Sequence, residues 1–201
     1  MMICRIIYSL FWNLYLRLKG AKIGMHFKAF GPIDILLRDG ATLKNLSIGN
    51  NVTFNGKVYI RMRKNGRIIL DNDIGIGTEV WLVSANDSNL EIGKNTGLGS
   101  YIILNAGHGL SIGSHCVFAS FIYINTSDHN FKKGQLIREQ GFSGSPVKIG
   151  DDVLIGGHVF IKKGVSIGSG SVIGAGSIVT KDIPENKIVF GNPAKIYKDR
   201  E

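Results

Sequence analysis

The sequence has few cysteines, few prolines and no long uninterrupted apolar run. Its 201 residues include 2 cysteines and 4 prolines. Cys4 and Cys116 make no disulfide framework and lack metal-ligand spacing, so we expect reduced thiols in a cytoplasmic protein. The apolar stretch at the N-terminus is interrupted too often to span a bilayer, which needs about 20 mostly apolar residues. No small-residue cleavage site follows it, so we do not expect a signal peptide.

Glycine and positive charge are abundant instead. The 27 glycines, together with a hydrophobic content of 44%, predict a folded chain with many tight turns. Lys and Arg number 24 against 15 Asp and Glu, which gives a net charge of +9. Such a balance suits nucleic acid, an anionic membrane surface or a polyanionic small ligand. Because no nucleic-acid-binding motif and no dense basic run occurs, we expect no nucleic-acid partner.

Residues 1–20 differ from the rest of the chain because their apolar side chains recur at helical spacing. The apolar positions are Ile3, Ile6, Ile7, Leu10, Phe11, Leu14 and Leu18, with Arg5, Ser9, Asn13 and Arg17 between them. The pattern predicts an amphipathic helix that either packs on the protein body or lies in a membrane interface. In the second case Trp12 would suit the headgroup boundary, and Arg17 and Lys19 would suit anionic lipid.

From Pro146 onward, one aliphatic residue recurs at a strict interval of six. These residues are Ile149, Ile155, Ile161, Ile167, Ile173 and Val179. The interval does not fit an amphipathic helix; it suits short strands joined by tight turns, each turning the chain through a third of a circle. One aliphatic residue per side then points inward and stacks on its equivalents. Glycine and Asn or Asp would occupy the corners, where a positive φ costs least.

The same interval continues toward the N-terminus in four triplets. They are Ile112/Phe118/Ile124, Ile92/Leu98/Leu104, Leu70/Ile76/Leu82 and Ile48/Phe54/Ile60. Each triplet predicts one triangular coil, and the longer stretches at 61–69, 83–91 and 105–111 would be loops at corners. The pattern favours an all-β, left-handed parallel β-helix over a β-sandwich or another solenoid. We expect the β-helix over residues 21–187, capped by the helix at 1–20 and a tail at 188–201.

The largest interruption runs from Thr126 to Pro146. This stretch is polar, contains glycine and is out of register, so it is the loop in which we expect function. His129 stands at its root, in the segment "SDHNF".

The segment from Val147 to Lys198 resembles the C-terminal half of the hexapeptide-repeat acetyltransferases. This family includes galactoside, maltose and serine acetyltransferases and the O-acetyltransferases of bacterial surface polysaccharides. "IGAGSIVTKDIP" and "GNPAK" are the most specific segments, and a looser repeat likeness extends back to about Ile23. The resemblance implies acetyl-CoA as co-substrate, a sugar hydroxyl as acceptor, no metal, and a homotrimer with sites between subunits. A lipid-linked acceptor at the inner face of the membrane would fit the apolar N-terminus.

The resemblance implies that His129 is the general base. An alcohol must lose its proton as it attacks a thioester carbonyl, and imidazole has a pKa near the working pH. The family suggests direct attack, so Cys116 is not expected to act as a nucleophile. The alternative is a loop histidine satisfied by the backbone. We expect the remaining histidines at corners or in loops: His26, His108, His115 and His158. The related γ-class carbonic anhydrases bind zinc through histidines close in sequence, a pairing that His129 lacks.

The resemblance also implies six donor contacts: Gly157, Ala175, Thr180, Lys181, Lys195 and Lys198. The N–H of Gly157 would lie near the thioester and Ala175 would line the pantetheine groove. The lysines would meet the phosphates as mobile point charges, the alternative for each being a solvated surface cation. Leu154 stands where many relatives have Trp, so one donor contact can differ.

The acceptor side is less defined. Polar positions of galactoside-type relatives fall here on Gly99 and Gly107, which argues against a galactoside pocket. Asn105 and Asp128 are the nearest polar candidates, and Asp128 could instead orient His129. Two other functions stay open: O-acetylation of an antibiotic or other xenobiotic alcohol, and a non-catalytic β-helix scaffold. The intact "SDHNF" and "GNPAK" segments disfavour the scaffold.

Overall fold

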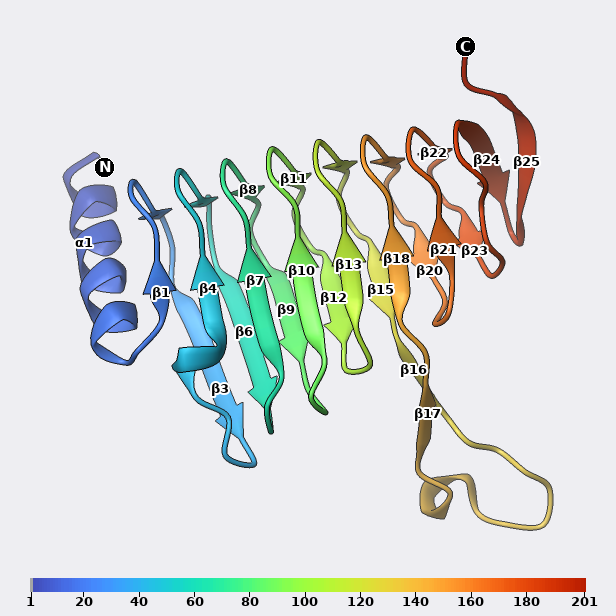
Figure 1. Ribbon diagram of the computed structural model, residues 1–201, viewed down its shortest axis with the longest axis horizontal. Coiled ribbons are helices and arrows are strands. Elements are labelled where there is room, and N and C mark those ends of the chain that lie inside the picture. The colour runs from blue at the N-terminus through green and yellow to red at the C-terminus, as the bar shows by residue number, and fades with distance from the viewer. Residues whose placement is uncertain (1) are drawn as a thin grey trace.

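The computed structural model describes residues 2–201, with side chains described from Ile6 onward. The predictions for the side chains of Ile3, Cys4 and Arg5 lie outside the described residues. The chain begins with helix α1 (Met2–Leu18) and continues as a triangular β-helix. A hairpin of β16 (Ser127–His129) and β17 (Phe142–Gly144) leaves the β-helix at one corner (Figure 1).

Three sheets form the sides of the triangle. Sheet A consists of β1 (Lys22–Ile23), β4 (Leu46–Ile48), β7 (Arg67–Leu70), β10 (Asn89–Ile92), β13 (Leu110–Ile112), β18 (Val147–Ile149) and β21 (Ser166–Ile167). Sheet B consists of β2 (Lys28–Ala29), β5 (Thr53–Phe54), β8 (Gly75–Ile76), β11 (Gly97–Leu98), β14 (Val117–Phe118), β19 (Leu154–Ile155), β22 (Val172–Ile173), β24 (Lys187–Gly191) and β25 (Ala194–Asp199). Sheet C consists of β3 (Ile33–Arg38), β6 (Val58–Arg63), β9 (Val80–Ser84), β12 (Ile103–Ala106), β15 (Tyr123–Asn125), β20 (Phe160–Ile161) and β23 (Ile178–Val179).

Each coil passes through sheets A, B and C in turn, so we name the corners A–B, B–C and C–A. Apart from the antiparallel pair β24–β25, neighbouring strands of these sheets are parallel. In Figure 1 the near strands of sheet A run upward and the far strands of sheet C run downward, while the chain advances to the right. That sense of rotation is left-handed. The predicted all-β, left-handed parallel β-helix is therefore confirmed.

The interior of the prism contains the aliphatic residues that recur every six positions. All six members of the series from Ile149 to Val179 are at most 4% exposed, and so are the four predicted triplets. They stack on their equivalents one coil away, as Leu104 does on Ile124 and Ile124 on Ile161. The hydrophobic effect acts on this column as a whole, because no coil can bury its apolar side chains alone.

Two details differ from the sequence-based expectation. The stretches at 61–69 and 83–91 are not loops alone: β6 continues to Arg63 and β9 to Ser84, which lengthens sheet C. In addition, left-handed backbone at corners is not confined to Gly, Asn and Asp. Tyr101 and Phe121 adopt φ values of 59° and 63°, a conformation that costs an L-residue about 1–2 kcal/mol.

Both ends of the prism are covered. Helix α1 lies across the first coil, with Leu16 fully buried against it. At the other end β24 extends sheet B, and β25 returns antiparallel along it. No helix among the described residues is long and apolar enough to cross a membrane.

The stacked interior predicts that stability depends on which face of a strand is truncated. Ile155 is fully buried and its neighbour Leu154 is 43% exposed on the opposite face of β19. We expect Ile155→Ala to lower the free energy of unfolding by about 2–5 kcal/mol. Leu154→Ala should lower it by about 0.5 kcal/mol or less. Urea denaturation followed by circular dichroism measures both, and equal losses would contradict the assignment of the core.

Candidate active site

His129 is held on the first strand of the hairpin at the C–A corner. Residues 127–129 pair with residues 142–144, which places His129 opposite Phe142. Their ring centroids are 4.1 Å apart. The side chain of His129 is exposed, and none of the described groups forms a hydrogen bond with its ring. The ring is therefore accessible to a bound molecule.

A hollow of about 260 Å³ beside His129 is lined by Asn, Ser and Tyr residues together with Asp128 and Phe142. Both predicted acceptor residues, Asn105 and Asp128, line it. Asn105 Nδ2 donates to Asn125 Oδ1 at 3.0 Å, and Asn125 Nδ2 donates to Ser127 O. This relay fixes the orientation of both amides and leaves the oxygen of Asn105 available to accept from a hydroxyl. Such a lining suits a polyhydroxylated acceptor.

Asp128 forms an ion pair with Lys163, whereas a residue that orients His129 would contact the imidazole. The Asp128 carboxylate lies 3.5 Å from Lys163 Nζ, which also donates to Ser143 Oγ at 2.7 Å. The sequence did not single out Lys163. Together with Lys132 and Lys162 it lines a second hollow beside His129, of about 550 Å³, whose wall also includes Asp128. Asp128 and His129 nevertheless line the same two hollows.

At the B–C corner, side-chain hydroxyls accept hydrogen bonds from the backbone of the preceding coil. Thr78 N donates to Ser100 Oγ, and Ser100 N donates to Ser120 Oγ, each at 3.1 Å. The next two coils have Gly157 and Ala175 at this position, so the row of hydroxyls ends. Within the described residues, the N–H groups of Ser120, Gly157 and Ala175 have no hydrogen-bond partner. These three N–H groups follow one another from coil to coil and could donate to the carbonyl oxygens of an extended ligand that contains amides.

Three aromatic rings stack at the same corner. Tyr101 lies 4.9 Å from Phe121, and Phe121 lies 4.8 Å from His158, with interplanar angles of 2° and 4°. Tyr101 and Phe121 are about half exposed. Each ring stands three residues after an inward apolar residue (Leu98, Phe118 or Ile155), so aligning the triplets would have revealed the stack. His158 is thus a corner residue, as expected. It is also the last ring of this stack and directly follows Gly157, whose N–H has no partner among the described residues.

The remaining predicted donor residues occupy two places. Thr180 and Lys181 follow β23 at the C–A corner, and both are exposed. Lys195 and Lys198 lie on β25, where Lys195 pairs with Phe190. The ammonium of Lys198 lies 3.9 Å from a carboxylate oxygen of Glu201.

One chain does not bring all these residues together. His129 follows sheet C at the C–A corner, whereas Gly157 and Ala175 precede it at the B–C corner. Sheet C separates the two corners, and the segment of residues 122–126 that crosses it through β15 spans roughly 16 Å at about 3.3 Å per residue. A thioester bound at Gly157 would therefore lie out of reach of His129 of the same chain.

Cys116 is buried and lies away from His129. Burial raises the pKa of its thiol, which lies 3.2 Å from the carbonyl oxygen of Gly150. A protonated, enclosed thiol is a poor nucleophile. Among the described side chains, no three His, Cys, Asp or Glu gather closely enough to hold a metal ion.

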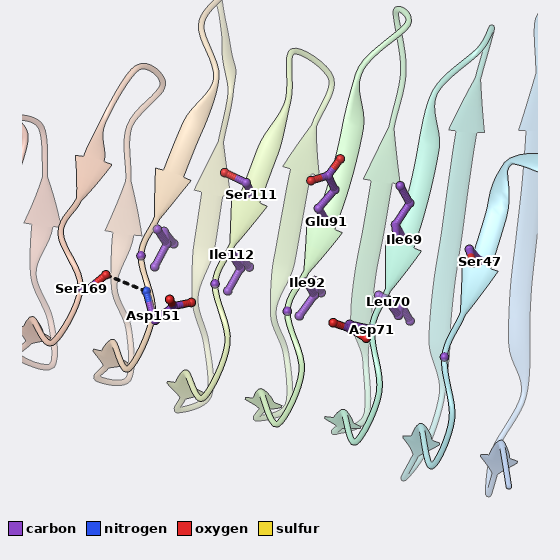
Figure 2. A pocket seen from close by; sticks show the side chains of 15 residues that line it. Ser47, Ile69, Leu70, Asp71, Glu91, Ile92, Ser111, Ile112, Asp151 and Ser169 are labelled. Atoms are coloured by element: carbon purple, nitrogen blue, oxygen red, sulfur yellow. Dashed lines mark hydrogen bonds between the residues drawn. The ribbon is translucent and has the colours of Figure 1, made fainter. Parts of the chain in front are cut away.

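A wide groove follows the outer face of sheet A (Figure 2). Asp71, Glu91 and Asp151 line it, and Asp151 N donates to Ser169 Oγ at 3.0 Å. These carboxylates would repel a phosphate-bearing donor, and none of the predicted site residues lies there. We therefore place the candidate site at the His129 hairpin and the B–C corner.

Comparisons with known proteins agree with this architecture. The family model described as the hexapeptide repeat of succinyl-transferase matches residues 146–181. The match falls on the segment in which the six-residue interval is strict. A probable acetyltransferase of Mycobacterium tuberculosis is 35% identical over 120 residues, which is 59% of this chain and 40% of the relative. The chain thus spans less than half the length of that relative.

Solved structures resemble this chain over most of its length. A maltose O-acetyltransferase from Clostridium difficile is 26% identical, with a TM-score of 0.54 and coverage of 98% of this chain and 88% of that one. AntD, an N-acyltransferase from Bacillus cereus solved with dTDP and 3-hydroxybutyryl-CoA, is 18% identical. Its TM-score is 0.66, with 94% and 88% of the two chains covered, a likeness of fold.

The hairpin root predicts a sharp response to one added methyl group. A Cβ at Gly144 would lie 2.0 Å from Cγ of His108, whose ring is half-buried beneath it. Gly144→Ala should therefore displace the strand that pairs with His129 and lower kcat at least tenfold, with little change in the melting temperature of the β-helix. Gly97→Ala is the control, because a Cβ there meets nothing within 4 Å. Full activity of Gly144→Ala would contradict a rigid hairpin root.

Proposed function

We propose that this protein transfers an acetyl group from acetyl-CoA to a hydroxyl of a sugar, with His129 as general base. The observation that carries the proposal is an exposed imidazole without a hydrogen-bond partner, next to a hollow lined by oriented amides. The likeness to a maltose O-acetyltransferase supports a sugar acceptor. A precursor of a surface polysaccharide in the cytoplasm, where acetyl-CoA is made, is the acceptor that we favour.

In the proposed mechanism the acetyl group passes directly from the coenzyme to the acceptor, without an acyl-enzyme intermediate. The His129 imidazole accepts the proton of the acceptor hydroxyl as the oxygen attacks the thioester carbon. The carbonyl oxygen gains negative charge, and the uncovered N–H of Gly157 stabilises it. The C–S bond then breaks, the acetyl group stays on the acceptor oxygen, and the imidazolium returns the proton to the thiolate of coenzyme A. A positioned base contributes about 10²–10⁴-fold to such a reaction.

The uncovered N–H groups at the B–C corner support the donor site. Pantetheine contains two amides in an extended chain, and its carbonyls can accept from this line of donors. Ala175 is small enough to let that chain approach the backbone. Lys195 on β25 pairs with Phe190, close to the B–C corner. Together with Lys198 it would contact the phosphates of the coenzyme. Thr180 and Lys181, at the other corner, would reach the coenzyme from the opposite side.

A homotrimer with sites between subunits supplies what one chain lacks. His129 of one subunit would meet the Gly157 corner of the next. Sheet C also exposes an apolar row that a neighbour would cover. In this row Tyr59 stacks on Trp81 with centroids 4.2 Å apart, and Ile103 and Tyr123 are 39% and 38% exposed.

Replacing the base tests the proposed chemistry. His129→Ala should lower kcat by about 10²–10⁴-fold, while the affinity for acetyl-CoA, measured by calorimetry, stays within about twofold. Thiol release with a panel of sugars and antibiotic alcohols is the assay. His115→Asn is the control, because His115 lies at the A–B corner with a φ of 61° that Asn tolerates.

Three results would contradict the proposal in different ways. If His129→Ala kept more than a tenth of the wild-type rate, His129 would not be the general base. Acetylation of antibiotics but of no sugar would favour the xenobiotic function. No thiol release with any acceptor, together with no acetyl-CoA binding, would favour a scaffold.

Subunit complementation tests the shared site. Ala175→Glu should block the donor groove, since Ala175 is exposed and the new carboxylate repels the coenzyme. His129→Ala and Ala175→Glu should each be inactive alone. When both chains are co-expressed and purified together, mixed trimers should regain activity, because one interface then has both intact halves. Mixed assemblies as inactive as the parents would contradict a site between subunits.

A further inference from the structure

Helix α1 turns its polar side toward the β-helix. Ser9 Oγ donates to the carbonyl oxygen of Ala29 at 3.1 Å and lies 3.0 Å from the Ala29 nitrogen, which donates to it. Asn13 Nδ2 donates to Phe27 O at 2.9 Å. Arg17 donates to Gly24 O at 3.1 Å. These side chains satisfy the open edge of the first coil, which would otherwise present unpaired backbone groups.

The apolar side of α1 is consequently exposed. Six large apolar side chains lie more than half exposed along it: Ile6 53%, Ile7 59%, Leu10 64%, Phe11 55%, Leu14 62% and Leu18 76%. Met25, in the neighbouring turn, is 66% exposed. An exposed row of six large apolar side chains along one helix is typical of an interaction site. Leu16, Trp12 and Tyr15 pack on the core, whereas most of the other large apolar side chains of α1 face away from it.

The charge around this surface has one sign. Residues 1–33 contain five cations and no Asp or Glu, and the first acidic residue is Asp34. Lys19, Lys22 and Lys28 are exposed. A second copy of the chain would bring the same positive charges and be repelled. A bilayer with anionic lipids offers both an apolar interior and negative headgroups, the two properties that this surface complements.

We infer that α1 docks this protein onto an anionic lipid bilayer, with the face formed by Ile6, Ile7, Leu10, Phe11, Leu14 and Leu18 in the acyl region. Figure 1 shows α1 lying across the N-terminal end of the β-helix. The long axis of the β-helix therefore points away from the bilayer. A hollow of about 440 Å³ between α1 and β2 has Ile6, Leu10 and Phe27 in its wall and Lys28 at its side. An acyl chain near a lipid phosphate fits this combination.

Vesicle co-sedimentation of the full-length protein tests the docking surface. The wild type should bind vesicles of phosphatidylcholine with phosphatidylglycerol, and bind phosphatidylcholine alone at least tenfold more weakly. Leu10→Ser/Leu14→Ser should lower binding to the anionic vesicles at least tenfold. Lys19→Glu/Lys22→Glu should lower it similarly and remove its dependence on salt.

Matched variants separate this surface from general stickiness and charge. Val117→Ser/Leu136→Ser removes two exposed aliphatic side chains elsewhere, and Lys94→Glu/Lys133→Glu changes the charge equally. Both should bind as the wild type does, and circular dichroism confirms that every variant is folded. Equal loss in the control variants would overturn the inference. So would absence of vesicle binding with concentration-dependent association of the wild type that Leu10→Ser/Leu14→Ser abolishes, because a second copy would then cover α1.

The docking does not depend on the proposed acetyl transfer. His129→Ala should bind vesicles as the wild type does, so a failure of the catalytic proposal leaves this measurement unchanged.

Discussion

Backbone hydrogen bonds between neighbouring coils hold each residue above its equivalent in the coil before. Gly93 N donates to Ile112 O, Gly113 N to Ile149 O and Gly150 N to Ile167 O, at 2.8–2.9 Å. Because these bonds keep the register, an insertion can leave the prism only at a corner. The hairpin at 126–146 does so, and Leu110 still pairs with Val147 across the gap. The scaffold thus fixes where a projecting side chain such as His129 can stand.

The same register turns single residues into ladders. Hydroxyls, amides and rings repeat from coil to coil. Within each such row, a side chain forms a hydrogen bond with the neighbouring coil or stacks on its equivalent there. Features able to bind a ligand arise where a ladder ends. The hydroxyl row ends at Gly157 and frees backbone donors, and the ring stack ends at His158 beside them. Tyr101 and Phe121 adopt the left-handed backbone that Glu79 also has at the equivalent corner position.

The repeat could be predicted from the sequence because its period is short, strict and carried by residues that the fold buries completely. The helical period of residues 2–18 was equally readable, but not its orientation. Periodicity separates a polar side from an apolar side; it cannot tell that the edge of the first coil needs Ser9 and Asn13 more than it needs Leu10. Lys163 escaped notice for a related reason. Its contact with Asp128 joins residues that only the return of the hairpin brings together.

The position of α1 constrains which acceptors the His129 site can serve. From β3 to β15, sheet C advances by four strand spacings, or about 20 Å at roughly 4.8 Å each. With α1 in a bilayer and the prism axis pointing away from it, His129 stands at least that far from the lipid surface. A single sugar attached to a lipid headgroup would not extend to the hollow at Asn105. An oligosaccharide would, and so would a soluble nucleotide-linked sugar. The two proposals are therefore compatible only for an acceptor that is either long or free of the membrane.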